Sequence, residues 1–166
     1  MSVTGEGPVT AYVGVGSNLD DPRRQVATAL DELGDLPATR VTRQSALYRT
    51  PPMGPPDQPD YINAVVELET GLAPLALLDE LQRLENLHRR VRGSERWGPR
   101  TLDLDLLLYG ELRLDEPRLT VPHPGLAQRA FVLVPLTEIA PALTIPGLGP
   151  VRRLCEAVDP TGMERL

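Results

Sequence analysis

The chain has 166 residues, of which 41% are hydrophobic and 24% are charged, as is usual for one globular domain. All 17 basic residues are Arg, which excludes the phosphate-binding Lys of a P-loop, the strand Lys of a kinase and any Schiff-base Lys. One Cys excludes an internal disulfide, two His argue against a poly-His metal site, and a net charge of −6 argues against broad affinity for nucleic acid.

Targeting and membrane signals are missing from the sequence. Residues 1–7 are small and polar and are expected to form a loose tail. No stretch approaches the ~20 apolar residues of a membrane span, and no basic segment followed by an apolar one marks a signal peptide. We therefore expect a cytoplasmic protein with no membrane partner. We also expect a monomer whose single domain spans residues 1–166 and which has no nucleic-acid partner.

Alternating apolar residues predict a first strand over residues 10–16. Turn residues follow, and Asp20 or Asp21 can cap a helix whose first residue is a proline. This helix should run over residues 22–33 and stop at Gly34.

The middle of the chain predicts two strands separated by a proline-rich segment. Residues 41–48 and 61–68 read as strands, whereas residues 50–59 contain five Pro and cannot form a helix or a central strand. A long helix is expected over residues 74–90. Its apolar face is expected to consist of residues at a spacing of three, namely Leu75, Leu78, Leu81 and Leu84.

A polar loop over residues 91–100 is expected to lead into a strand over residues 101–109. After it, prolines break the chain into short elements, with a last helix near residues 151–158 that holds Cys155 in the core. The element order predicts an α+β fold of the ferredoxin-like kind, with helices packed on one face of a mostly antiparallel sheet.

Two carboxylates on the strand over residues 101–109 are the first candidate site. On a strand, Asp103 and Asp105 point to the same side with Cα atoms ~6.6 Å apart, and their mutual repulsion favours a divalent cation between them. The alternative is a solvated strand face. The opposite face is expected to be apolar and to carry Leu102, Leu104, Leu106 and Leu108.

A cluster of arginines is the second candidate. Residues 83–100 carry a net charge of +4 in an acidic chain, which points to a compact polyanion such as a triphosphate. The alternative, Arg side chains that complement the dipole of a helix end, can explain Arg89 and Arg90. It explains Arg96 and Arg100 less well.

Aromatic and amide side chains suggest a site for a flat ligand. Trp97 lies in a Gly/Pro loop among arginines, and alternation places Tyr61 and Asn63 on one strand face, where they can stack on a heterocycle and read its edge. A half-buried edge strand is an equally good reading of Tyr61 and Asn63 in isolation. His123 could simply lie at a surface turn.

Several of these segments resemble the 6-hydroxymethyl-7,8-dihydropterin pyrophosphokinase family. The most specific motif is RWGPRTLDLD at residues 96–105. The likeness extends from about Thr10 to Gly147 and includes VGVGSNL at 13–19, YRTPP at 48–52, DQPDYINA at 57–64 and LTVPH at 119–123.

This resemblance implies a ferredoxin-like fold and the transfer of a diphosphate group from ATP to the hydroxymethyl oxygen of the pterin, with release of AMP. It implies that Asp103 and Asp105 hold two Mg²⁺ ions, and that Arg90 and Arg92, in a mobile loop, act catalytically on the phosphates. The implied ATP site comprises Gln82, Glu85, Arg90, Arg92, Trp97, Arg100, Thr120, His123 and Arg129. The implied pterin site comprises Gly16, Thr50, Pro51, Tyr61, Asn63, Trp97 and Phe131.

The sequence departs from the family pattern at two positions: several relatives have Lys where Gly93 stands, and an aromatic residue follows the His where Pro124 stands. Two rival functions remain. A Mg²⁺-dependent nucleotidyltransferase can also use an Asp-x-Asp pair, but it would release pyrophosphate. A single-stranded RNA-binding module can share the fold, although such modules are usually basic and stack bases on aromatic residues, of which this chain has few.

Overall fold

Six antiparallel strands form the central sheet of the computed structural model, which describes residues 7–19, 21–51, 59–92 and 102–166 and only the backbone at 90–92. The strands are β1 (Val9–Ser17), β2 (Thr39–Gln44), β3 (Tyr48–Thr50), β4 (Tyr61–Thr70), β5 (Asp103–Tyr109) and β10 (Glu164–Arg165). They are ordered β10-β3-β4-β1-β5, and β2 also pairs with β4.

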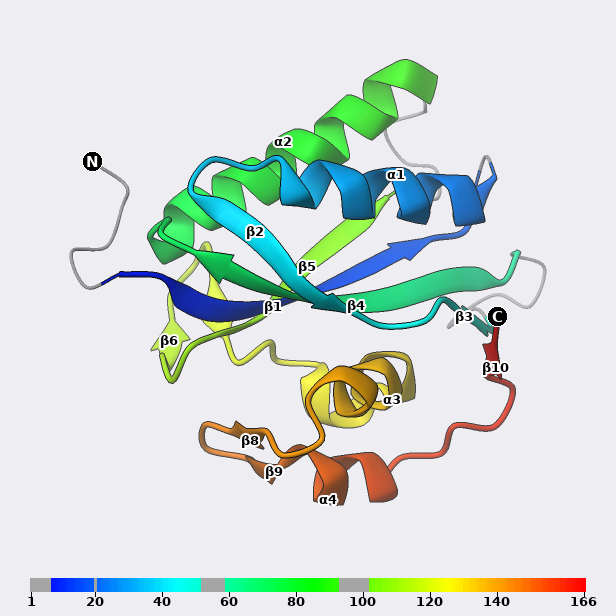
Figure 1. Ribbon diagram of the computed structural model, residues 1–166. Helices are drawn as coiled ribbons and strands as arrows, with labels where there is room; N and C mark the ends of the chain where they lie inside the picture. Colours follow the sequence, from blue (N-terminus) through cyan, green and yellow to red (C-terminus); the bar gives the residue numbers. More distant parts are fainter. Residues whose placement is uncertain (1–6, 20, 52–58, 93–101) are drawn as a thin grey trace.

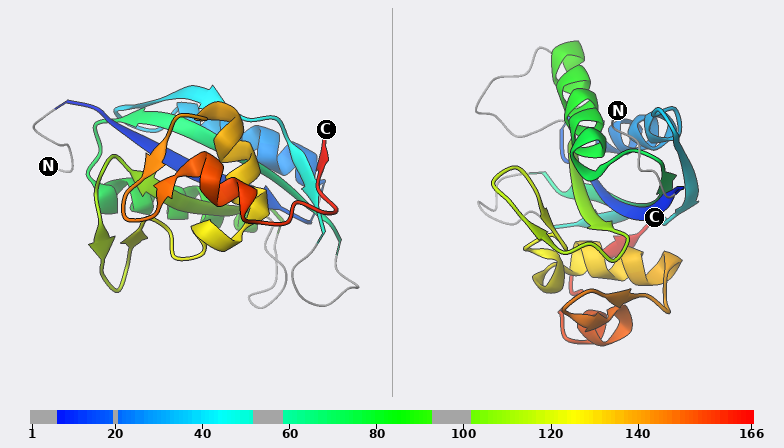
Figure 2. Two further views of the ribbon diagram at one scale, coloured as in Figure 1. Left: turned by 90° about the horizontal axis from the view of Figure 1, so that it is seen from below. Right: turned by 90° about the vertical axis from the view of Figure 1, so that its left-hand side faces the viewer.

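Helices cover both faces of this sheet (Figures 1 and 2). One face packs against α1 (Pro22–Gly34) and α2 (Pro74–Arg92). The other lies against α3 (Ala130–Ile139), with α4 (Val151–Glu156) beyond it. The α+β, ferredoxin-like class is confirmed. The expectation that helices cover only one face is wrong, because the C-terminal segment supplies a second apolar layer.

The remaining elements are short. The structure contains the hairpin β6 (Leu114–Asp115) with β7 (Thr120–Val121), the hairpin β8 (Thr144–Ile145) with β9 (Gly149–Pro150), and a 3₁₀ turn, η1 (Leu126–Gln128). Helix α4 begins where the sequence predicts and ends two residues early, and Cys155 is only partly buried. Within the described ranges, no helix has both the length and the apolar character needed to cross a bilayer.

The two long helices begin as expected and pack through a slightly different face. Asp21 precedes α1, but its side chain makes no capping bond and its backbone is left-handed, at φ 62°. On α2, Leu75 is 37% exposed whereas Leu77 is fully buried. A strict spacing of three drifts around a helix of 3.6 residues per turn, so the expected placement of Leu75 in the core is wrong.

A buried histidine joins α1 to α2. His88 is 6% exposed, and its Nδ1 lies 2.6 Å from Gln25 Oε1 while its Nε2 lies 2.5 Å from Glu32 Oε1. His88 thus continues the buried face of α2 with a polar contact. Helix α2 itself extends to Arg92, so the expectation that a loop begins at residue 91 is wrong. No helix-breaking residue precedes Gly93, which explains the extension.

The predicted strand over residues 41–48 is two strands on the same neighbour, because regular pairing with β4 is interrupted at residues 45–47. Ser45 Oγ accepts a hydrogen bond from Val65 N at 3.0 Å. The next amide, Ala46 N, donates to the Glu138 carboxylate of α3 at 3.0 Å. Strand β3 then resumes pairing with β4, and β10 covers its outer edge.

Strand β5 contains a bulge. The pairing partners step from Leu106 to Leu108 while those on β1 advance by one residue, so Leu107 is an extra residue. Leu107 and Leu108 therefore both pack on the α3 side, and Tyr109 returns to the α1–α2 side. The expectation that Leu108 shares a face with Leu102, Leu104 and Leu106 is wrong for this reason.

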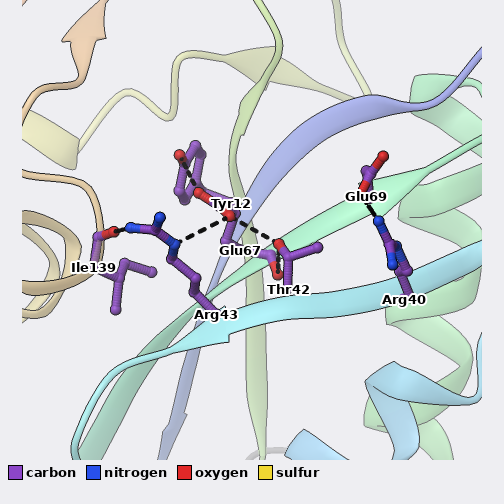
Figure 3. A network of polar contacts seen from close by, with 7 residues as sticks. All are labelled: Tyr12, Arg40, Thr42, Arg43, Glu67, Glu69 and Ile139. Carbon is purple, nitrogen blue, oxygen red and sulfur yellow. Dashed lines mark hydrogen bonds and ion pairs between the residues drawn. The ribbon is translucent and has the colours of Figure 1, made fainter.

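A polar network joins strands β1, β2 and β4 of the sheet to the end of α3 (Figure 3). Glu67 accepts hydrogen bonds from Tyr12 Oη at 2.7 Å and Thr42 Oγ1 at 2.8 Å. Arg43 Nη1 donates to Ile139 O at 2.9 Å, at the C-terminus of α3. Burial, followed by the contact with Glu67, raises the pKa of Tyr12. The network fixes α3, whose N-terminal end faces the candidate site.

Candidate functional site

A cavity of about 160 Å³ lies between the sheet and α3. Residues from β1, β3, β4, β5 and α3, and from the chain next to them, line it: Gly14, Val15, Gly16, Thr50, Pro51, Tyr61, Asn63, Ala64, Asp103, Asp105, Arg129, Phe131 and Val132. Segments separated by more than a hundred residues of sequence therefore meet at one place.

This cavity brings together most of the residues assigned to the pterin site. Those that line it are Gly16, Thr50, Pro51, Tyr61, Asn63 and Phe131. Trp97, the remaining one, lies outside the described residues. Both aspartates and Arg129 line the same cavity, so the expected pterin side and phosphate side adjoin one another.

A buried amide is held in one orientation beside Gly16. Asn63 is 7% exposed, and its Nδ2 donates to Thr50 Oγ1 at 2.7 Å. Gly16 and Asn63 are partners on β1 and β4, and a Cβ at residue 16 would lie 2.6 Å from Asn63 Oδ1. The carboxamide thus occupies the space that a glycine leaves. Thr50, which accepts from Asn63, retains its own hydroxyl proton for donation.

The Asp-x-Asp pair lies on the cavity side of β5. Alternation places Asp103 and Asp105 on one face, and both are partly exposed. Arg129 Nη1 lies 3.8 Å from Asp105 Oδ2, and the guanidinium lies over the Phe131 ring, 5.6 Å from its centre. Arg129 therefore links the aromatic wall to the carboxylates.

His123 follows β7, and the charges of Asp105 and Arg129 act on its imidazole ring. Its Nδ1 accepts a hydrogen bond from Gly125 N at 3.0 Å, which leaves Nε2 to carry the proton of the neutral ring. Burial is the main reason that the pKa of His123 lies below its ordinary 6.5. The Asp105 carboxylate acts in the opposite direction and the Arg129 guanidinium in the same direction.

This shift predicts a pH dependence of stability. Below about pH 6.5, the unfolded chain takes up a proton at His123 more readily than the folded protein does, so the free energy of unfolding falls as pH decreases. Urea unfolding of the wild type and His123→Asn at pH about 7.5 and about 5.5 measures the effect. Between the two pH values, the free energy of unfolding should fall less in the variant than in the wild type. An equal fall in both would contradict the lowered pKa of His123.

Other expected ATP-site residues do not line the cavity. Thr120 is on β7, where its hydroxyl donates to Asp115 at 3.3 Å. Gln82 is on α2 and accepts from Arg118 Nη2 at 3.3 Å, while the same nitrogen donates to Asp79 at 2.5 Å. Arg118, which no sequence pattern singles out, therefore contacts one of the expected ATP-site residues.

Glu85 reaches from α2 to β5, where its Oε2 accepts a hydrogen bond from Leu104 N at 2.8 Å. Arg90 and Arg92 lie in the last turn of α2, not in a loop, and the structure describes their backbone alone. Trp97 and Arg100 fall outside the described residues. Four members of the expected set are thus not placed as side chains.

The donor chemistry suits a hard divalent cation. Mg²⁺ is commonly bound through one or two carboxylates together with substrate phosphates, and Asp103 and Asp105 offer two carboxylates at a cavity. Among the described residues, no group of three or more His, Cys, Asp or Glu side chains comes together as a metal-binding cluster. A cation here would therefore need ligands beyond these two carboxylates.

Comparison with known sequences gives long matches. Residues 12–141 match the family described as 7,8-dihydro-6-hydroxymethylpterin-pyrophosphokinase. The chain is 52% identical over 155 residues to the 2-amino-4-hydroxy-6-hydroxymethyldihydropteridine pyrophosphokinase of Pseudomonas aeruginosa, covering 93% of this chain and 95% of that protein. It is also 52% identical over 138 residues to the enzyme of the same name from Haemophilus influenzae, covering 83% and 86%.

Comparison with solved structures supports the fold. The chain superposes on a crystal structure of a Plasmodium falciparum HPPK-DHPS triple mutant with pteroate, with a TM-score of 0.75 and 14% sequence identity. The match covers 99% of this chain and 48% of the other, so the chain spans about half the length of that protein. At this identity the likeness concerns the fold alone.

Proposed function

Because the chain belongs to the 7,8-dihydro-6-hydroxymethylpterin-pyrophosphokinase family, we propose that it transfers a diphosphate group from ATP to 6-hydroxymethyl-7,8-dihydropterin and releases AMP. The observation that carries this proposal is the shared cavity: six residues assigned to the pterin and both aspartates line it. A cytoplasmic monomer with these two small-molecule substrates and no nucleic-acid partner is part of the proposal.

The pterin binds in the cavity between the sheet and α3. Thr50 and Asn63 form hydrogen bonds to the polar edge of the ring system. The apolar and aromatic walls of the cavity are formed by Tyr61, Pro51 and Phe131. Gly16 leaves room for the Asn63 carboxamide. The family resemblance assigns Trp97, which lies outside the described residues, to the same pterin site. The hydroxymethyl group then faces Asp103 and Asp105.

ATP binds on the side of α2 and β7. Gln82, Thr120 and His123 contact the nucleotide, and His123 donates from Nε2 in its neutral form. Arg90, Arg92, Arg100 and Arg129 bind phosphate oxygens, to which Arg forks are suited. Asp103 and Asp105 would hold two Mg²⁺ ions. Bound there, Mg²⁺ supplies neutralisation of phosphate charge and a lowered pKa for a coordinated hydroxyl.

The reaction exchanges one phosphorus–oxygen bond for another. The pterin hydroxymethyl oxygen forms a bond to the β-phosphorus, the bond from that phosphorus to the α,β-bridging oxygen breaks, and AMP leaves with the bridging oxygen. The hydroxyl proton passes to solvent. Positioning and charge neutralisation by the protein are the main requirements of such transfers, which matches a site of carboxylates and arginines.

The product mixture tests this function. Incubation with ATP, Mg²⁺ and the reduced pterin should yield AMP and a diphosphorylated pterin by mass analysis, and EDTA should abolish both. Release of pyrophosphate with a nucleotidylated pterin would establish a nucleotidyltransferase instead. An RNA-binding module is disfavoured because such modules stack bases on an open sheet face. Here α1 and α2 cover one face of the sheet and α3 covers the other (Figure 2).

A further inference from the structure

Glu85 makes an unusual contact for a residue expected to bind ATP. Its side chain is partly buried, and Oε2 is hydrogen-bonded to the amide of Leu104 in β5. Leu104 is 4% exposed and belongs to the same apolar cluster as Leu81 and Leu84 of α2. The carboxylate therefore crosses from a helix to a strand inside a mostly apolar layer.

Strand β5 needs such a contact because it ends the sheet. In the described part of the chain, β5 pairs with β1 and with no other strand of the sheet. An edge strand has outward-facing backbone groups without a strand partner, and a buried amide left without an acceptor is costly. Glu85 supplies the acceptor at Leu104, and its negative charge strengthens the hydrogen bond.

The position of this bond along β5 gives it a role beyond local stability. Leu104 lies between Asp103 and Asp105, whose side chains project to the opposite face of the strand, toward the cavity. Holding the Leu104 amide fixes the peptide plane that joins Asp103 to Leu104, at the centre of the Asp-x-Asp pair. The separation and direction of the two carboxylates therefore depend on a residue that lies on the other side of the sheet.

We propose that Glu85 is a positioning residue, which orients Asp103 and Asp105 by holding the backbone of β5 from α2. This proposal rests on the proposed function for its effect on turnover, but the contact itself does not. It assigns the Glu85 carboxylate to the strand, whereas the family resemblance places it at ATP.

Hydrogen exchange of the Leu104 amide, measured by NMR without ligands, tests the contact. The amide should be protected in the wild type and in Glu85→Gln, whose neutral amide oxygen can still accept the hydrogen bond, and should exchange at least about tenfold faster in Glu85→Ala. Equal protection in Glu85→Ala would overturn the proposal, whatever reaction the protein catalyses.

Steady-state kinetics test the consequence. Glu85→Ala should lower kcat by about tenfold to about a hundredfold through misplacement of the aspartates, and raise the Mg²⁺ concentration for half-maximal rate, with the KM for ATP changed by less than about threefold. Glu85→Gln should recover most of the kcat. Glu80→Ala, which removes the same charge from α2 at a residue paired with Arg83, is the matched control.

The outcomes separate the possible roles. A loss in Glu85→Gln equal to that in Glu85→Ala would show that charge matters and the hydrogen bond does not, which overturns positioning. A raised KM for ATP with normal kcat would show a ligand of ATP, which also overturns it. An inactive wild type with a protected Leu104 amide would contradict the proposed function and leave the contact standing.

Discussion

Replacing either aspartate of β5 by asparagine should reduce turnover by at least about 10³-fold, because each variant removes one of the two carboxylates proposed to hold Mg²⁺. The fold should survive. Asp103 and Asp105 are partly exposed, and the Arg129 contact to Asp105, at 3.8 Å with partly exposed side chains, contributes little to stability. Removing one of two neighbouring like charges also relieves repulsion in the protein without metal.

The measurement is the initial rate of AMP formation over a range of Mg²⁺ concentrations, together with thermal unfolding of each variant. Asp31→Asn, on the exposed side of α1, removes the same charge away from the cavity and is the control. If Asp103→Asn or Asp105→Asn keeps more than about a tenth of the wild-type rate at saturating Mg²⁺, the residue does not hold the metal.

Gly16→Ala should impair pterin binding far more than Gly14→Ala. A Cβ at residue 16 would lie 2.6 Å from Asn63 Oδ1, so the carboxamide must move and lose its bond to Thr50. We expect the KM for the pterin to rise by about tenfold to about a hundredfold and the free energy of unfolding to fall by ~1–3 kcal/mol. The KM for ATP should change little.

Gly14, which also lines the cavity, provides a control for an added methyl group on the same strand face. A Cβ there would lie 3.6 Å from the nearest Leu107 carbon, an ordinary contact distance. Gly14→Ala should therefore shift the KM for the pterin by less than about threefold. Substrate titrations and urea unfolding of both variants provide the test. Equal effects at the two positions would mean that Asn63 is not placed by the space at residue 16.

Local sequence patterns predicted the parts of the site that depend on one strand. Alternation alone placed Asp103 with Asp105, and Tyr61 with Asn63, on shared faces. The meeting of these strands with Phe131 and Arg129 is a tertiary event that no local pattern encodes. The family resemblance supplied those residues because it carries information about the whole fold.

The failures have local physical causes. Helix α3 was not predicted, because Pro135 lies inside it and an internal proline argues against a helix. In the structure, residues on either side of Pro135 nevertheless pack against the sheet. The bulge at Leu107 places Leu108 on the opposite face of the strand from the predicted one. The sequence could not indicate this change, because the run is apolar throughout and has no alternation of polar and apolar residues. The buried His88 could not be foreseen, since its partners Gln25 and Glu32 lie on another helix.

Because of its bulge, β5 must keep its number of residues for each side chain to face the correct layer. On the α3 side, the strand changes from carboxylates at 103 and 105 to leucines at 107 and 108, and Tyr109 returns to the other side, where its hydroxyl donates to Leu72 O. Substitutions that keep polarity can be absorbed one at a time. Deleting or inserting one residue would turn every later side chain to the wrong layer. Descendants of this sequence should therefore vary in the composition of β5 while conserving its number of residues.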